Sequence, residues 1–216
     1  MVINKTVGTG VLHLAKQTPV IKALFGPYRL DVANPRDGEA YICADSERRP
    51  TWNDVEDGLQ ALAMSLGLVP KGGSEVRLKE LVAVLAVHYG QDAGGVQHLL
   101  DPVVEQRVEL SELFRLADVL DDGHGLKAIE MENASYCSSP ELWGFGGAGF
   151  YLGRQVVLHS SSATALVIGK RLDEALERGD VDAAAGMLQA QMKRMVAGVL
   201  DQAMQRELER RLGLPG

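Results

Sequence analysis

Residues 120–153 read LDDGHGLKAIEMENASYCSSPELWGFGGAGFYLG, and within this stretch the chain changes from helical to strand-like patterning. Before it, apolar residues recur every three or four positions, which is the spacing of one buried helical face. Inside it, and on to residue 169, apolar and polar residues alternate imperfectly and the composition becomes that of strands. We therefore predict a short antiparallel meander over residues 126–169.

Three helices are predicted before this stretch. The first spans 51–67 and shows the pattern of a capping box, with Thr51 as the N-cap residue and Asp54 three positions later. The second spans 74–90 and follows after a short connection, so we expect the two helices to form an αα-hairpin. The third begins at Ser111 and ends at the edge of the quoted stretch.

The chain after the meander is predicted to be helical again. Residues 170–179 lead into a helix capped by Asp180, and its apolar stripe loses phase near Asp201, where we expect a kink or a new helix. Methionines lie on or near this stripe. We expect them in the core, although a flexible methionine-rich face also suits a partner protein; they are Met187, Met192, Met195 and Met204.

The order of elements determines the predicted fold class. Residues 27–44 are predicted to form two short strands around the turn NPRDG, and they precede the helices. The resulting order is β–β–α–α–α–β–β–β–α–α. This order is typical of the α+β class. We predict a single α+β domain over 1–216. Its mixed body, 1–169, holds a small antiparallel sheet and the αα-hairpin, and the helices of 170–216 form a C-terminal arm packed on it.

The composition limits the classes of partner. The chain has 216 residues, 46% of them apolar, and a net charge of −7, which disfavours nucleic-acid binding as a property of the whole protein. Residues 1–30 nevertheless carry four basic residues and no acid, whereas 101–122 are strongly acidic. The basic segment is interpreted as a solvated edge of the core; the alternative is a docking surface for an acidic patch.

Cysteine usage and the N-terminus indicate the compartment. Two cysteines, Cys43 and Cys137, do not make a disulfide framework in a chain of this size, so we expect reduced thiols. The N-terminal segment lacks an uninterrupted apolar run, and no stretch reaches the length of a membrane span. The sequence therefore predicts a cytoplasmic protein with no membrane partner.

The quoted stretch also holds the candidate catalytic residues. The DDGHG of 121–125 is interpreted as a helix C-cap and turn, with a glycine at positive φ and His124 favouring the helix dipole. The alternative is a small hydrolase or transferase in which Cys137 is the nucleophile and His124 or His159 the base. As zinc ligands the same three residues lack the usual spacings, so no metal site is predicted.

The glycines of GFGGAGFYLG raise the possibility of a phosphate loop. Such a loop needs a helix N-terminus after it, so that backbone N–H groups point at the anion. Strand-like sequence follows instead, and we predict a β-turn or bulge and no cofactor.

Two segments carry a resemblance. LFRLADVLDDGHGLKAIEMENASYC, followed by GFGGAGFYLGRQVVLHSSS, resembles uncharacterised proteins carried on proteobacterial plasmids and integrative conjugative elements. The resemblance covers about a quarter of the chain and implies no activity for any named residue. It implies an accessory role in a mobile genetic element: regulation, DNA maintenance, transfer, or interference with host defence.

The resulting hypothesis is a non-enzymatic accessory protein that acts through protein–protein contacts, as a homo-oligomer or with a partner. The first alternative is the cysteine-dependent enzyme built on Cys137 with His124 or His159. The second is an acidic nucleic-acid mimic or anti-defence protein, for which the acidic run of 101–122 is the candidate surface.

Overall fold

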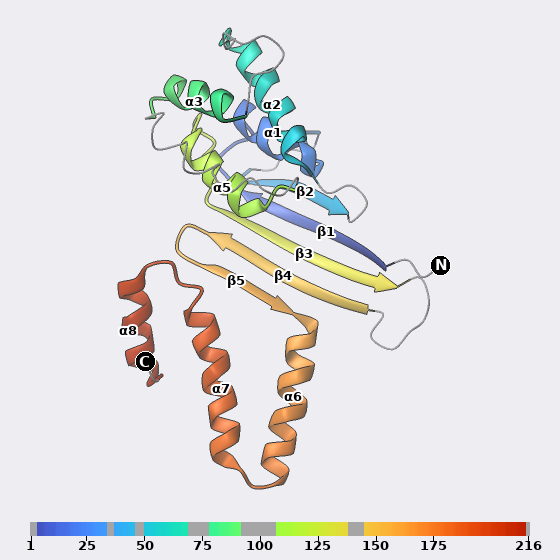
Figure 1. The fold of residues 1–216 in the computed structure, drawn as a ribbon, viewed down its shortest axis with the longest axis vertical. Coiled ribbons are helices and arrows are strands. Elements are labelled where there is room, and N and C mark those ends of the chain that lie inside the picture. Colours follow the sequence, from blue (N-terminus) through green and yellow to red (C-terminus); the bar gives the residue numbers. More distant parts are fainter. Residues whose placement is uncertain are drawn as a thin grey trace. The chain divides into compact units, whose positions relative to one another are not determined.

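The computed structural model describes residues 4–33, 37–45, 50–68, 78–91, 107–137 and 145–214. It has the predicted α+β class, and its elements are drawn in Figure 1. The strands are β1 (Asn4–His13), β2 (Glu39–Asp45), β3 (Ala128–Cys137), β4 (Phe145–Gly153) and β5 (Val157–Ser161). The helices are α1 (Pro19–Phe25), the 3₁₀ turn η1 (Gly26–Tyr28), α2 (Trp52–Ser65), α3 (Leu78–His88), α5 (Leu110–Val119), α6 (Ser162–Glu177), α7 (Val181–Val196) and α8 (Gln202–Leu212).

The strands form one sheet in the order β2-β1-β3-β4-β5, and β1–β2 and β4–β5 are antiparallel pairs. The chain groups into two compact units, which are called here the N-terminal unit (7–129) and the C-terminal unit (1–6 with 130–216). Among the helices of the described residues, none combines the length and the apolar character needed to cross a membrane.

Helix α2 of the N-terminal unit forms as its sequence predicts. The hydroxyl of Thr51 accepts a hydrogen bond from the backbone N–H of Asp54, and the Asp54 carboxylate accepts one from the N–H of Thr51, which completes the capping box. Leu59 and Leu62 are buried. Helix α1 packs on α2 so closely that a Cβ atom at Gly58 would overlap the carbonyl oxygen of Ala23.

The start of the chain differs from the prediction. Residues 27–33 are not a strand, and the strand that pairs with β2 is β1, with Leu12 opposite Ala40. Between them lies α1, capped by Thr18, with its apolar residues buried: Val20, Ile21, Ala23, Leu24 and Phe25. This apolar content is core, and the basic residues around it lie on its edge.

The C-terminal unit contains the strands of the predicted meander, with two corrections. Strands β4 and β5 form a hairpin, with Phe150 opposite His159. The glycine-rich segment forms most of β4 rather than a turn, and Gly147 lets the carbonyl of Asn133 approach closely. Residues 163–169, predicted as a strand, form the first half of α6, because their inward positions continue the helical spacing that ends at buried Ala175.

The C-terminal helices begin where the sequence predicts. Asp180 caps α7 by accepting from Ala183 N–H (3.0 Å), and Asp201 caps α8 by accepting from Ala203 N–H (2.7 Å). The new helix expected near Asp201 is therefore present. In Figure 1, α6 and α7 lie side by side and are joined by a short turn.

Candidate functional site

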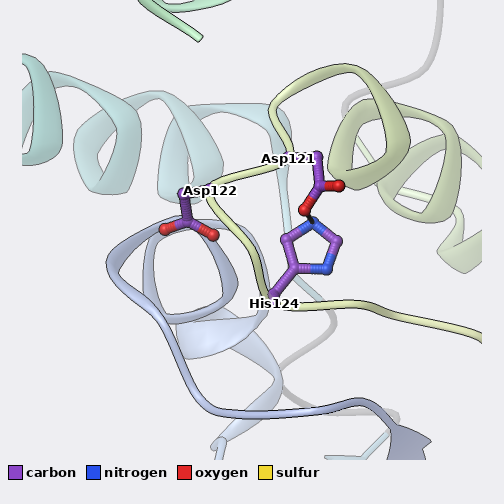
Figure 2. Close-up of side chains that lie close together, drawn as sticks. All are labelled: Asp121, Asp122 and His124. Atoms are coloured by element: carbon purple, nitrogen blue, oxygen red, sulfur yellow. Dashed lines mark ion pairs between the residues drawn. The ribbon is translucent and has the colours of Figure 1, made fainter.

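The DDGHG segment joins several parts of the N-terminal unit. Asp121, Asp122 and His124 come from the loop between α5 and β3, and each offers a ligand atom within 4.8 Å of the others. Figure 2 shows the imidazole beside the Asp121 carboxylate, at 3.7 Å from Nε2 to Oδ1. His124 is 1% exposed, whereas Asp121 is exposed.

Both ring nitrogens of His124 are engaged within the chain. The N–H of Leu126 donates to Nδ1 at 2.8 Å, so Nδ1 carries a lone pair and Nε2 carries the proton. Nε2–H then donates to the carbonyl oxygen of Ala117 at 2.9 Å. The backbone carbonyl of His124 accepts in turn from Ala15 N–H at 2.7 Å. His124 is therefore a buried residue whose hydrogen bonds link three segments, at Ala15, Ala117 and Leu126, rather than a turn residue that acts on the helix dipole.

The two aspartates also accept hydrogen bonds from backbone N–H groups of the N-terminal unit. Asp122 Oδ2 accepts from the N–H of Val20 at 3.0 Å and so supplies a second cap to α1 from a distant part of the chain. Burial and then the charge of Asp122 raise the pKa of the Tyr89 hydroxyl. Asp121 Oδ1 closes the turn by accepting from Gly123 N–H at 2.9 Å.

The turn chemistry predicted for this segment is confirmed. Gly123 has φ +86° and Gly125 has φ +58°, a region in which a side chain is strained. As a metal site the cluster fits poorly, because a cation on Nδ1 would have to displace the N–H of Leu126, and Nε2 already carries a proton. The segment serves the fold of its own unit.

Cys137 and His159 both belong to the C-terminal unit but lie at different places on its strands. Cys137 is the last residue of β3 and is buried, and both cysteines are free. His159 lines a pocket of about 370 Å³ together with Glu130 and Glu132 of β3. Cys137 lies five positions after Glu132, which corresponds to roughly 17 Å along a strand. That is far beyond the reach of a proton transfer between the thiol and the imidazole.

The pocket lies between the strands and α7. A Cβ at Gly198 would touch the side chain of Leu158, so Leu158 points toward the residues that follow α7. Because strand side chains alternate, the imidazole of His159 points to the opposite face of the strand. His159 therefore lines the pocket with its backbone atoms. Gln191 contributes a side-chain oxygen that has no hydrogen-bond partner, but this atom is buried and closed to a ligand arriving from solvent.

The largest departure from the predicted burial is on α7. Ala184 and Val196 of this helix are buried, whereas a row of apolar residues that lies between these two directions around the helix remains largely exposed, and its last member also lines the pocket. This row is called the α7 stripe. It follows the alternating four-three spacing of a coiled-coil seam, with the exposed fractions in parentheses: Val181 (66%), Ala185 (exposed), Leu188 (48%), Met192 (37%) and Met195 (56%).

Three of the four methionines predicted in the core are exposed, and the fourth, Met187, is half-buried. Met192 and Met195 lie on the α7 stripe, and Met204 of α8 is 58% exposed. Periodicity alone identified the stripe, but it carries no information on whether the stripe faces the chain's own core or the outside.

Charge is distributed along α7 in a particular order. Residues 183–192 contain no charged side chain. Asp180 and Asp182 lie at the N-terminal end, and Lys193 and Arg194 lie in the last turn. The α7 stripe is thus a neutral apolar surface with an acidic end and a basic end.

No known protein family, curated protein or solved structure matches this chain. Its function is therefore inferred from the three features described above: the DDGHG segment, the pocket beside β5, and the α7 stripe. Most polar groups of the first are engaged in holding the N-terminal unit together, and Asp122 Oδ1 is buried without a hydrogen-bond partner among the described residues. The third leaves a regular apolar surface exposed, and this surface is the candidate functional site.

Proposed function

We propose that this protein is a non-enzymatic interaction protein that binds a partner through the α7 stripe. The single observation that carries the proposal is five exposed apolar side chains at coiled-coil spacing on one helix. Continuous apolar surface of this kind is costly in water and typically marks a protein interface. The spacing further favours a helix as the docking element, because knobs from a facing helix fit a four-three row.

Two further considerations support an interaction role over the enzymatic alternative. His124 has both ring nitrogens hydrogen-bonded within its unit, which leaves it no lone pair to act as a base. Strand geometry separates Cys137 from His159 by several residues of β3. We extend the proposal to the setting that the resemblance implies, an accessory protein of a bacterial mobile element.

Photo-crosslinking in cells tests the proposed function. The full chain would carry the photoreactive residue p-benzoylphenylalanine in place of Leu188, at the centre of the α7 stripe. Ala190 is the matched control: it is also exposed, and two residues at about 100° each turn it to the other side of the helix. We expect a protein adduct from position 188 and much less from position 190. Equal yields from the two positions, or none, would reject the α7 stripe as a binding surface.

A further inference from the structure

We infer that the partner of the α7 stripe is a second copy of this chain, with the two α7 helices packed antiparallel about a two-fold axis at Leu188. This inference rests on the proposed function and adds the identity of the partner and the direction of packing. It follows from two symmetries of the helix: one in the spacing of its apolar residues and one in the order of its charges.

The outermost apolar residues of the α7 stripe are placed symmetrically about Leu188, and the inner two are offset by one position. Val181 lies seven residues before it and Met195 seven residues after it, and Ala185 and Met192 lie three before and four after. In an isologous two-fold interface, residue i contacts residue j of the partner and residue j contacts residue i. An antiparallel copy therefore places Val181 against Met195 twice and Leu188 against itself.

The charges select the antiparallel arrangement. Asp180 and Asp182 lie at one end of the helix and Lys193 and Arg194 at the other. A parallel pair would bring acids beside acids and bases beside bases. An antiparallel pair brings each acidic end to a basic end and also opposes the two helix dipoles.

The flanking positions agree with this arrangement. Eleven residues at about 100° each bring Lys193 to within roughly 20° of the direction of Asp182, so both lie on the same side of the helix, about 120–140° around it from Leu188. In a two-fold pair at Leu188, Asp182 and Lys193 of the other copy stand at nearly the same level on the same side, and only their side chains can reach across; this juxtaposition occurs twice. Lys193 also has an interaction within its own chain, which its three N–H donors allow it to share.

Sedimentation equilibrium of the full chain is the first measurement. We expect a reversible dimer that persists at high salt, because burial of the apolar stripe provides most of the affinity and is not screened. Leu188→Glu should weaken the dimer roughly 100-fold or more, since two carboxylates would be buried at the axis. Ala190→Glu, on the other side of the helix, should leave it unchanged. A dimer that Leu188→Glu does not weaken would overturn the inference.

Charge reversal then tests the direction of packing. Asp182→Lys or Lys193→Glu alone replaces two attractive contacts with two repulsive ones, and each should weaken the dimer roughly tenfold at low salt. The double variant restores opposite charges across an antiparallel interface and should recover most of the affinity. Circular dichroism of each variant confirms that α7 is intact. Single variants that weaken the dimer without rescue in the double variant would overturn the antiparallel assignment.

The two proposals fail in different ways. If position 188 crosslinks to a different protein and the purified chain sediments as a monomer, the inference of a second copy is wrong while the interaction function stands. If position 188 gives no adduct above the control, the proposed function itself is wrong. An adduct with twice the mass of the chain and the rescue by the double variant support both.

Discussion

His124 shows how a single buried polar side chain can hold segments that are far apart in sequence. Its ring connects the end of α5, through the carbonyl of Ala117, to the start of β3, through the N–H of Leu126. Its own carbonyl receives Ala15 from the segment that follows β1. An apolar residue of similar size would fill the space but leave a donor and an acceptor unpaired in the interior.

Replacement of His124 is therefore expected to cost more than the 0.3–1 kcal/mol typical of a charge at a helix end. His124→Ala removes the ring partners of Ala117 O and Leu126 N–H, and we predict a loss of roughly 2–4 kcal/mol in the free energy of unfolding. Urea denaturation of the purified chain measures it. Asp121→Ala is the matched control, because its exposed carboxylate should be worth less than about 1 kcal/mol. Equal losses in the two variants would show that the ring hydrogen bonds contribute little.

At the scale of elements, the packing of α1 on α2 depends on one glycine in a helix. Glycine usually weakens a helix interior, so a change to alanine commonly stabilises it by up to about 1 kcal/mol. Gly58 of α2 is different, since a Cβ there would overlap the carbonyl oxygen of Ala23 in α1. The two helix backbones approach each other only because this position lacks a side chain.

Two glycine-to-alanine changes should therefore have opposite signs. We predict that Gly58→Ala destabilises the protein by roughly 1–3 kcal/mol, because α1 must move away from α2. Gly186→Ala in α7 has open space around it and should stabilise by up to about 1 kcal/mol. Chemical denaturation of both variants decides this. Stabilisation by Gly58→Ala would mean that α1 and α2 are not packed at this position.

The cap of α8 gives that helix a dependence on pH. Hydrogen bonds from the N–H groups of Met204 and Ala203 lower the pKa of the Asp201 carboxyl. A carboxyl with a lowered folded-state pKa contributes stability that is present above its ordinary value of about 3.9 and is lost as the pH falls through the folded-state pKa.

We therefore expect α8 to lose its cap in acid and Asp201→Asn to lack this response. The asparagine oxygen accepts the same hydrogen bonds without titrating. Nuclear magnetic resonance signals of the Ala203 and Met204 amides, followed from neutral pH to below pH 3, should shift together with protonation in the wild type. They should stay nearly constant in the variant. Identical profiles in the two proteins would show that Asp201 does not cap α8 in solution.

At the scale of the molecule, the sequence predicts the elements that depend on local patterns. The capping box of Thr51, the cap of Asp180 and the alternation that begins at β3 all act within a few residues, and all three are found as predicted. Strand β1 was not predicted, because two of its inward positions are Gly8 and Gly10. Both are buried, but glycine adds nothing to an apolar pattern.

Other features depend on partners that no local pattern contains. Residues 163–169 of α6 are rich in residues that favour strands, and only their packing in the C-terminal unit decides for a helix. The duties of His124 follow from donors and acceptors at residues 15, 117 and 126, so its neighbours in sequence gave no sign of its burial. The same limit applies to the α7 stripe, whose period is visible in the sequence and whose exposure is not.

The dependence of the unfolding temperature on protein concentration tests whether the folded chain associates through the α7 stripe. A partner that binds only the folded chain stabilises it by mass action, so a folded dimer unfolds at a temperature that rises with protein concentration. For a chain of this size we predict a rise of about 1–3 °C for each tenfold increase, measured by scanning calorimetry. Leu188→Glu should remove this dependence and keep the unfolding temperature that the wild type approaches at high dilution.

Leu152→Ala, in the buried part of the same unit, is the control. It should lower the unfolding temperature at every concentration and keep the slope, because its cost of roughly 2–5 kcal/mol acts on the folded chain itself. If the unfolding temperature rises equally with protein concentration in the wild type and in Leu188→Glu, the association surface lies away from α7.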